Sequence, residues 1–164
     1  MATVINVSAG NEAVLGLGDS ASNASIAAAF TDGLIVPYMQ DITINNSTGV
    51  FRWKTLDSTA ESAATTPATN QLTLNVVVDS DAFFGVDVGT NDTVKDSGLF
   101  GSSKAKTRVY FEIGFQGRDT GSKLLKGSGF ISGLAPTVNM DAPVWVTPVT
   151  IEVDGDFTES AVPA

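Results

Sequence analysis

Apolar and polar residues alternate along two stretches of this chain, and this alternation limits the fold more than any other feature of the sequence. In QLTLNVVVD, residues 71–79, apolar side chains occupy every second position from Leu72 to Val78. KTRVYFEIGFQ, residues 106–116, repeats the pattern from Val109 to Phe115 and places Glu112 on the opposite face. Because successive side chains of a strand point to opposite faces of a sheet, each segment predicts a strand with one buried and one solvated face.

Residues 34–56, LIVPYMQDITINNSTGVFRWKTL, contain two further strand-like arms separated by NNSTG. Asn and Gly tolerate the left-handed backbone that a tight turn needs, so we expect a long hairpin that turns within NNSTG. Ile42 and Ile44 share one face of the first arm, and Phe51 and Trp53 share one face of the second arm.

Two C-terminal segments combine a strand pattern with an irregularity. VWVTPVTIEVDGDF changes phase at Pro148, which cannot donate to a sheet ladder, so a bend or bulge is expected there. KGSGFISGL, residues 126–134, carries Gly127, Gly129 and Gly133. Because glycine weakens a strand interior, its repetition predicts a bulge, a bend or a close approach of another backbone to this segment.

Helical patterns are scarce. SNASIAAAFTDG, residues 22–33, predicts one short helix, and SDAFFG, residues 80–85, predicts a single turn. Residues 57–70 and 86–104 show no periodicity and predict two long loops. We therefore expect one domain over residues 1–164, with an N-terminal segment at 1–35 that contains the short helix. Its fold is predicted to be mainly β, an antiparallel β-sandwich or barrel with one short flanking helix and the long hairpin at 34–56.

The composition disfavours several classes of function. A formal charge of −9 is the opposite of what tight binding to nucleic acid requires. The chain has no histidine and no cysteine, so the commonest general base and the thiolate nucleophile are missing. We therefore expect no enzyme, no cofactor and no metal site. LGDSAS, residues 17–22, resembles the surroundings of an esterase serine, but no histidine is present to take the proton of Ser20.

Acidic residues leave two weaker alternatives open. Paired carboxylates at Asp79 and Asp81, and at Asp154 and Asp156, lack the further ligands of a calcium loop and favour solvated turns. A glycosidase needs two opposed carboxylates, and the candidates are Glu61, Glu112, Glu152 and Glu159. Their separation cannot be fixed from the sequence.

The segment MATVINVSAG lacks the basic and apolar blocks of a secretory signal, and no apolar run reaches the roughly 18 residues that span a bilayer. We expect a soluble protein made in a cytoplasm. Long strands, few charges and the lack of a reaction centre indicate a protein that packs against copies of itself, because unpaired strand edges attract partners.

The order of segments resembles the major tail tube protein of tailed bacteriophages. The likeness rests on the DITI strand and its hairpin ending in KTLDS, on LTLNVVVDSD and RVYFEIGF, and on the closing stretch LKGSGFISGLAPTVNMDAPVWVTPVTIEVDGDFTES. It covers residues 38–56, 71–80 and 107–160, whereas the first 35 residues and the 86–104 loop match poorly. The resemblance implies a virion protein of the phage tail, assembled in the host cytoplasm.

The resemblance further implies hexameric rings that stack into a tube, whose lumen conducts DNA without binding it specifically. Six copies at −9 each give −54 per ring, so a lumen that carries much of this charge repels phosphates. Sheath, tape measure and tail terminator proteins are the further partners that the resemblance implies. Together with the patterns above, it makes six residues candidates for contacts between subunits: Ile42, Ile44, Phe51, Trp53, Gly127 and Gly129.

Two other functions fit a β-rich soluble chain. A capsid decoration or cement protein would form small discrete particles and would not polymerise alone. A carbohydrate-binding β-sandwich would need an exposed aromatic platform, for which two Trp and two Tyr are available.

Overall fold

The computed structural model describes residues 13–27, 32–86, 93–141 and 143–163. In chain order the elements are β1 (Val14–Gly18), β2 (Leu34–Ile35), β3 (Met39–Trp53), β4 (Ser62–Val77), α1 (Ser80–Phe84), α2 (Val94–Ala105), β5 (Arg108–Gly114), β6 (Lys123–Leu134), β7 (Val146–Val153) and β8 (Thr158–Ala161). The predicted mainly antiparallel β class is confirmed.

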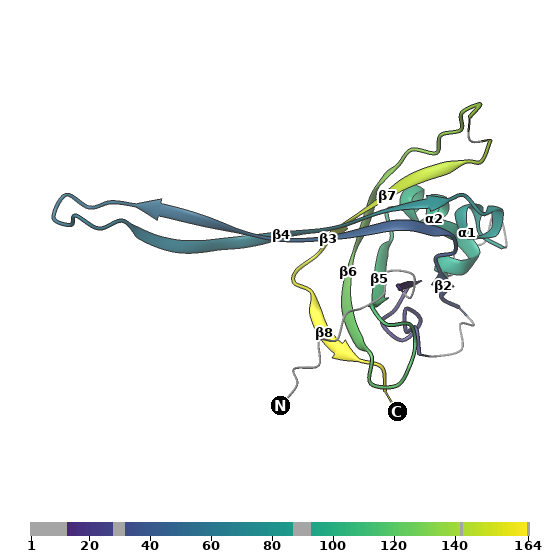
Figure 1. The fold of residues 1–164 in the computed structure, drawn as a ribbon, viewed down its shortest axis with the longest axis horizontal. Coiled ribbons are helices and arrows are strands. Elements are labelled where there is room, and N and C mark those ends of the chain that lie inside the picture. The colour runs from purple at the N-terminus through teal and green to yellow at the C-terminus, as the bar shows by residue number, and fades with distance from the viewer. Residues whose placement is uncertain (1–12, 28–31, 87–92, 142, 164) are drawn as a thin grey trace, which may run out of the picture.

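In the described part of the chain, eight strands form one sheet: seven follow the order β2-β1-β5-β6-β7-β4-β3, and β8 pairs with β6 beside this path. Strand β6 pairs with β5 along one edge, and its other edge pairs first with β8 and then with β7. The fold is thus a continuous curled sheet and not two separate layers, with α1 and α2 packed at one end of it (Figure 1). A long ribbon formed by β3 and β4 projects from the opposite side.

The alternation in the sequence correctly identifies the core. Its largest fully buried side chains come from β1, β4, β5 and β7 and include Leu15, Leu17, Leu72, Leu74, Val109, Phe111, Ile113, Val149 and Ile151. Together they make one hydrophobic cluster on a single face of the sheet. Burial of such side chains contributes about 1.5–3 kcal/mol each, which makes this cluster the main source of stability.

The predicted position of the hairpin turn is wrong. Strand β3 runs without interruption through residues 45–49, with a bulge between Thr48 and Val50, and the connection to β4 lies at residues 54–61. The predicted loop at 57–70 is also wrong over its second half, because residues 62–70 belong to β4. Polar pairs such as Asn46 with Asn70 and Ser47 with Thr69 continue the ladder, so backbone pairing overrides the turn propensity of NNSTG.

Of the other local predictions, one is confirmed and the others are wrong in part. The single turn at 80–85 is confirmed as α1. Residues 94–104 of the predicted 86–104 loop belong to α2, and residues 87–92 lie outside the described residues. Residues 22–27 of the predicted N-terminal helix form turns, and residues 28–31 lie outside the described residues. The bulge expected at Pro148 is instead in β6 between Ile131 and Gly133, while β7 passes Pro148 in unbroken register with β4.

Candidate self-association surfaces

The β3–β4 ribbon divides into a base that packs on the core and a distal arm that does not. Ile42 and Ile44 lie at the base, are half-buried, and pack against the hydrophobic cluster. In contrast, residues 45–53 of β3 and 62–67 of β4 are all exposed. We call residues 45–67 the distal arm, which stands away from the body (Figure 1). An isolated two-stranded ribbon is only marginally stable in water, so an arm of this kind is typical of a contact with another molecule.

Phe51 and Trp53 form an aromatic pair on one face of the distal arm. Their ring centroids are 5.8 Å apart with an interplanar angle of 19°. Phe51 is 60% exposed and Trp53 is 40% exposed. Arg52 lies on the opposite face, 3.8 Å from the Glu61 carboxylate. A stacked aromatic pair that remains open to solvent is the kind of feature that is enriched at protein interfaces.

The glycines of β6 are explained by close contacts within the same chain. A Cβ at Gly127 would lie 2.5 Å from the Phe111 ring, and a Cβ at Gly129 would overlap the Glu152 carbonyl oxygen. The predicted close approach is therefore correct, but the approaching groups are the core and strand β7 of the same chain. Of the six candidate contact residues, Phe51 and Trp53 are the two whose side chains are open to a second subunit.

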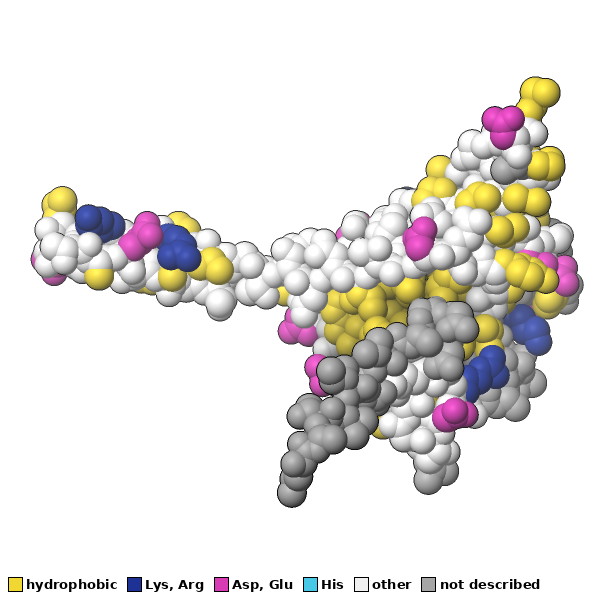
Figure 2. Space-filling view, in the orientation of Figure 1, with side chains coloured by type: hydrophobic (Ala, Val, Ile, Leu, Met, Phe, Trp, Pro, Cys, Tyr) yellow, Lys and Arg dark blue, Asp and Glu magenta, His cyan; other side chains and the backbone are white. Residues whose placement is uncertain are grey.

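Two further exposed apolar groups were not found from the sequence. Phe84, Val86 and Phe100 lie on and beside α1 and α2, and a second group lies on the loop between β6 and β7, at Val138, Met140, Val144 and Trp145. One signal for the group at the helices was present in the sequence, the pair Phe83 and Phe84 in SDAFFG. Two adjacent aromatic side chains on a single helical turn cannot both reach the core, so one of them is expected to be exposed. Figure 2 shows apolar groups on both projections of the molecule.

The face of the sheet opposite the core is polar and carries few cations. Asn75 donates to the Asp41 carboxylate at 2.8 Å, and Gln71 donates to the Glu152 carboxylate at 2.7 Å. The threonines of three neighbouring strands lie side by side in register, Thr43 with Thr73 and Thr73 with Thr150. At the tip of the distal arm, hydrogen bonds from the side chain of Thr55 and from the backbone lower the pKa of Asp57.

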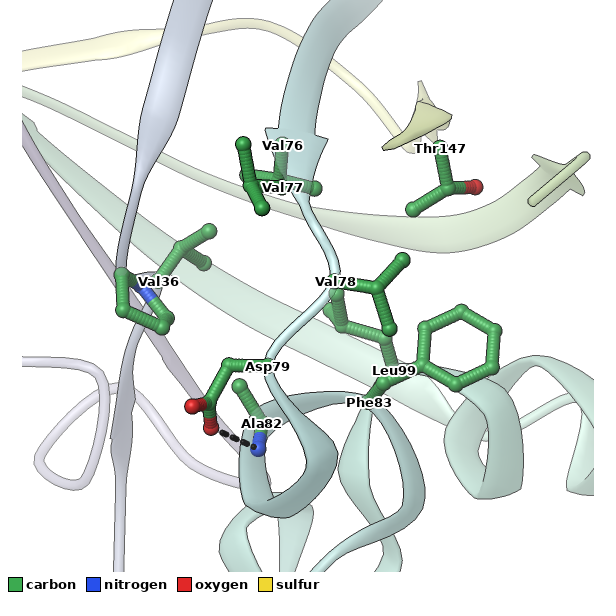
Figure 3. A pocket seen from close by; sticks show the side chains of 10 residues that line it. Val36, Val76, Val77, Val78, Asp79, Ala82, Phe83, Leu99 and Thr147 are labelled. Carbon is green, nitrogen blue, oxygen red and sulfur yellow. Dashed lines mark hydrogen bonds between the residues drawn. The ribbon is translucent and has the colours of Figure 1, made fainter. Parts of the chain in front are cut away.

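The enclosed space near the helices is too small for a ligand. One cavity of about 10 Å³ is lined by Val36, Val76, Ala82, Phe83 and Leu99, and the Asp79 carboxylate next to it accepts the Ala82 N–H (Figure 3). This volume is about that of one water molecule. Within the described residues, no group of three or more acidic side chains is placed to hold a metal ion. No described helix has the length and apolarity needed to cross a membrane.

No family model and no curated protein matches this chain. Among solved structures, one match is a chain of the virion of the native gene transfer agent particle, with a TM-score of 0.62 and 9% identity. Another is a chain of the tail of the empty gene transfer agent particle, solved by helical refinement with C6 symmetry, with a TM-score of 0.64 and 9% identity. Each match covers 94% of this chain and 100% of the other chain.

This chain shares its fold with a chain of the gene transfer agent tail. The likeness confirms, at the level of the fold, the resemblance to tail tube proteins that the sequence indicates. Because each match covers 94% of this chain, the likeness is not confined to a few strands.

Proposed function

We propose that this chain is a structural subunit of a phage tail, in which six copies close into a ring and rings stack into a tube. The observation that carries the proposal is the match over the full length of a chain from a C6-symmetric tail. The exposed distal arm supports it, because an isolated two-stranded ribbon with an exposed aromatic pair is stabilised by a partner surface. A role in assembly also accounts for a chain without histidine or cysteine, which we propose is not an enzyme.

Electron microscopy of concentrated recombinant protein tests this function. Hollow rods or six-fold rings support it. A compact monomer at every concentration and salt tested overturns it, and small trimeric particles overturn it in favour of a decoration protein. Light scattering coupled to size-exclusion chromatography, run on the same samples, gives the mass of the smallest stable assembly.

The polar face of β3, β4 and β7 makes this assembly suitable as a conduit for DNA. Neutral threonine and amide side chains alternate there with the carboxylates of Asp41 and Glu152, and these groups offer no strong attraction to phosphates. We propose that this face lines the lumen and that DNA passes without specific binding. Assembled tubes should then retain no duplex DNA at low salt, and a salt-sensitive affinity for duplex DNA contradicts this part of the proposal.

The remaining partners follow from the same role. A tail tube contacts the proteins that terminate it, set its length and, in contractile tails, surround it. We propose that this chain meets tape measure, terminator and sheath proteins in the tail of a virion assembled in the host cytoplasm. Co-purification from infected cells with a tagged copy of the chain tests these contacts, and recovery of the chain in the soluble capsid fraction alone contradicts them.

A further inference from the structure

Exposed apolar side chains gather in three places on the described part of the chain. The arm patch consists of Val50, Phe51, Trp53 and Leu56, the helix patch consists of Phe84, Val86 and Phe100, and the loop patch consists of Val138, Met140, Val144 and Trp145. Of the large exposed apolar residues that the structure describes, all but Tyr38 and Phe130 belong to one of these patches. Such concentration is typical of interaction surfaces, since single exposed apolar residues are otherwise scattered.

The helix patch is held in place by an unusually close contact between α1 and α2. Gly85 and Gly98 both have positive φ, at 88° and 65°, and a Cβ at Gly98 would overlap the Gly85 nitrogen. The hydroxyl groups of Ser97 and Ser102 are 3.0 Å apart across the kink in α2. Glycine is required at both positions, so the two helices are held in one arrangement.

This arrangement presents two phenylalanine rings to solvent around a third, buried ring. The Phe83 ring lies 4.9 Å from Phe84, edge to face, and 5.8 Å from Phe100. Phe84 remains 52% exposed and Phe100 remains 46% exposed, although Phe83 is buried. Rings fixed in advance lose little conformational entropy when a partner covers them, which favours binding.

An open groove of about 340 Å³ adjoins the helix patch. Val86 lies on its edge, and its apolar lining comes from Leu34, Ile35, Pro37 and Ala82. Its charged lining consists of Asp79, Asp81 and Lys95, so the groove carries one more negative than positive charge. An occupant with exposed apolar side chains and a cation at its edge would suit this site.

The distal arm has this composition. The arm patch supplies four apolar side chains, and Lys54 lies beside them in the sequence. Arg52 is paired with Glu61 on the other face, and with Asp57 the distal arm carries no net charge. The loop patch is a poorer complement because its one charged residue, Asp141, is acidic. Figure 2 shows Lys and Arg together with acidic side chains on the horizontal projection, whereas the other projection shows an acidic group and no Lys or Arg near its end.

Within one chain the two surfaces cannot meet, because the ribbon tip and the helices lie at opposite ends of the molecule (Figure 1). We infer that the arm patch of one copy docks on the helix patch and groove of a second copy. Such a contact joins two different surfaces, so a pair of copies still has one free arm patch and one free helix patch, and the pairing continues into a closed ring or a filament. This inference rests on the proposed function and gives it a defined pair of contact surfaces.

Complementation between two variants tests the contact. Phe51→Ser with Trp53→Ser removes the arm patch, and Phe84→Ser with Phe100→Ser removes the helix patch. Each double variant should associate with itself at least tenfold more weakly than the unchanged chain. Mixed together they should form a 1:1 complex, because each contributes the surface that the other lacks. Absence of this complex, or undiminished self-association of the helix-patch variant, overturns the inference.

A matched control and a check on folding accompany these variants. Phe130→Ser removes a partly exposed apolar side chain that belongs to none of the three patches and should leave self-association within twofold of the unchanged chain. Circular dichroism and the unfolding midpoint show whether each variant is folded. If the helix-patch variant does not fold, the single change Val86→Asp at the edge of the groove takes its place, with the same tenfold loss expected.

Crosslinking tests the same contact without removing an apolar side chain at the helices. The chain has no cysteine, so Leu56→Cys and Val86→Cys introduce unique thiols at the arm tip and at the groove. A short bismaleimide should yield a covalent dimer from a mixture of the two variants and none from either variant alone. The absence of a crosslink in the mixture contradicts the contact.

The two proposals fail in distinguishable ways. If the unchanged chain forms rods and the helix-patch variant forms them equally well, the inferred contact is wrong and the tube function stands. If the unchanged chain forms neither rings nor rods under any condition while the mixed variants still crosslink and pair, the contact stands and the tube function is wrong.

Discussion

The backbone N–H of Ile26 donates to the Glu112 carboxylate at 2.9 Å, across 86 positions of sequence. The other carboxylate oxygen of Glu112 lies 2.7 Å from the Lys126 ammonium group, and the Glu112 side chain is almost fully buried. Ile26 packs beside it in a small second cluster with Leu124 and Val162. The turn segment at residues 19–27 is therefore fixed against the sheet by one buried charge.

Replacing this charge should destabilise the fold. In Glu112→Ala, the Ile26 N–H and the Lys126 ammonium group lose their acceptor, and we expect a loss of about 2–4 kcal/mol in the free energy of unfolding. Urea denaturation measures it. Glu61→Ala is the matched control, since the Arg52–Glu61 pair is exposed and its loss should cost no more than about 1 kcal/mol. Equal losses in the two variants would show that burial of Glu112 has no energetic role.

The glycines of β6 should differ in their tolerance of alanine. Gly129→Ala forces a methyl group against the Glu152 carbonyl oxygen and Gly127→Ala forces one against the Phe111 ring, so each should cost about 1–3 kcal/mol. Gly133→Ala is the control because its nearest neighbour, the Thr150 side chain, would be at an ordinary 3.6 Å. It should be neutral or slightly stabilising, since alanine restricts the unfolded chain. Thermal unfolding of the three variants ranks them, and an equally large loss at Gly133 would contradict this account.

Periodicity predicted which side chains lie on each face of a strand, but not which other segments of the chain pack over that face. The buried positions of β4 and β5 follow directly from their alternation. Glu112 was assigned to the solvated face by the same rule, and it is buried because residues 19–27 fold over that face. This contact between distant segments leaves no local pattern in the sequence.

The distal arm and the helix patch were missed in part for a related reason. Turn propensity placed the hairpin reversal at NNSTG, although Asn45 to Thr48 continue an antiparallel ladder with β4. Short polar side chains fit an exposed strand as well as a turn, so propensity alone could not decide between them. The helix patch depends on the packing of Gly85 on Gly98, which no alternation reports.

Shortening the ribbon should separate folding from assembly. If an Asn-Gly turn replaces residues 48–68 and joins Ser47 to Thr69, which face each other in register, the base with Ile42 and Ile44 is retained. The free energy of unfolding should change by no more than about 1 kcal/mol, because the removed residues are nearly all exposed. Rods should be lost in electron micrographs. Rods of normal length from the shortened chain would show that the distal arm is not needed for assembly.

Assembly should accelerate as salt rises. Each copy carries −9, so association brings like charges together, and raising NaCl from about 20 mM to about 300 mM shortens the screening length from roughly 20 Å to about 6 Å. Contacts such as Lys54 with the acidic groove lie at an exposed rim and contribute little against this long-range repulsion. Light scattering after a concentration jump measures the rate. Asp119→Asn with Asp141→Asn lowers the charge of a six-copy ring from −54 to −42 and should weaken the dependence on salt. Dissociation on adding salt would instead show that ion pairs between subunits dominate their association.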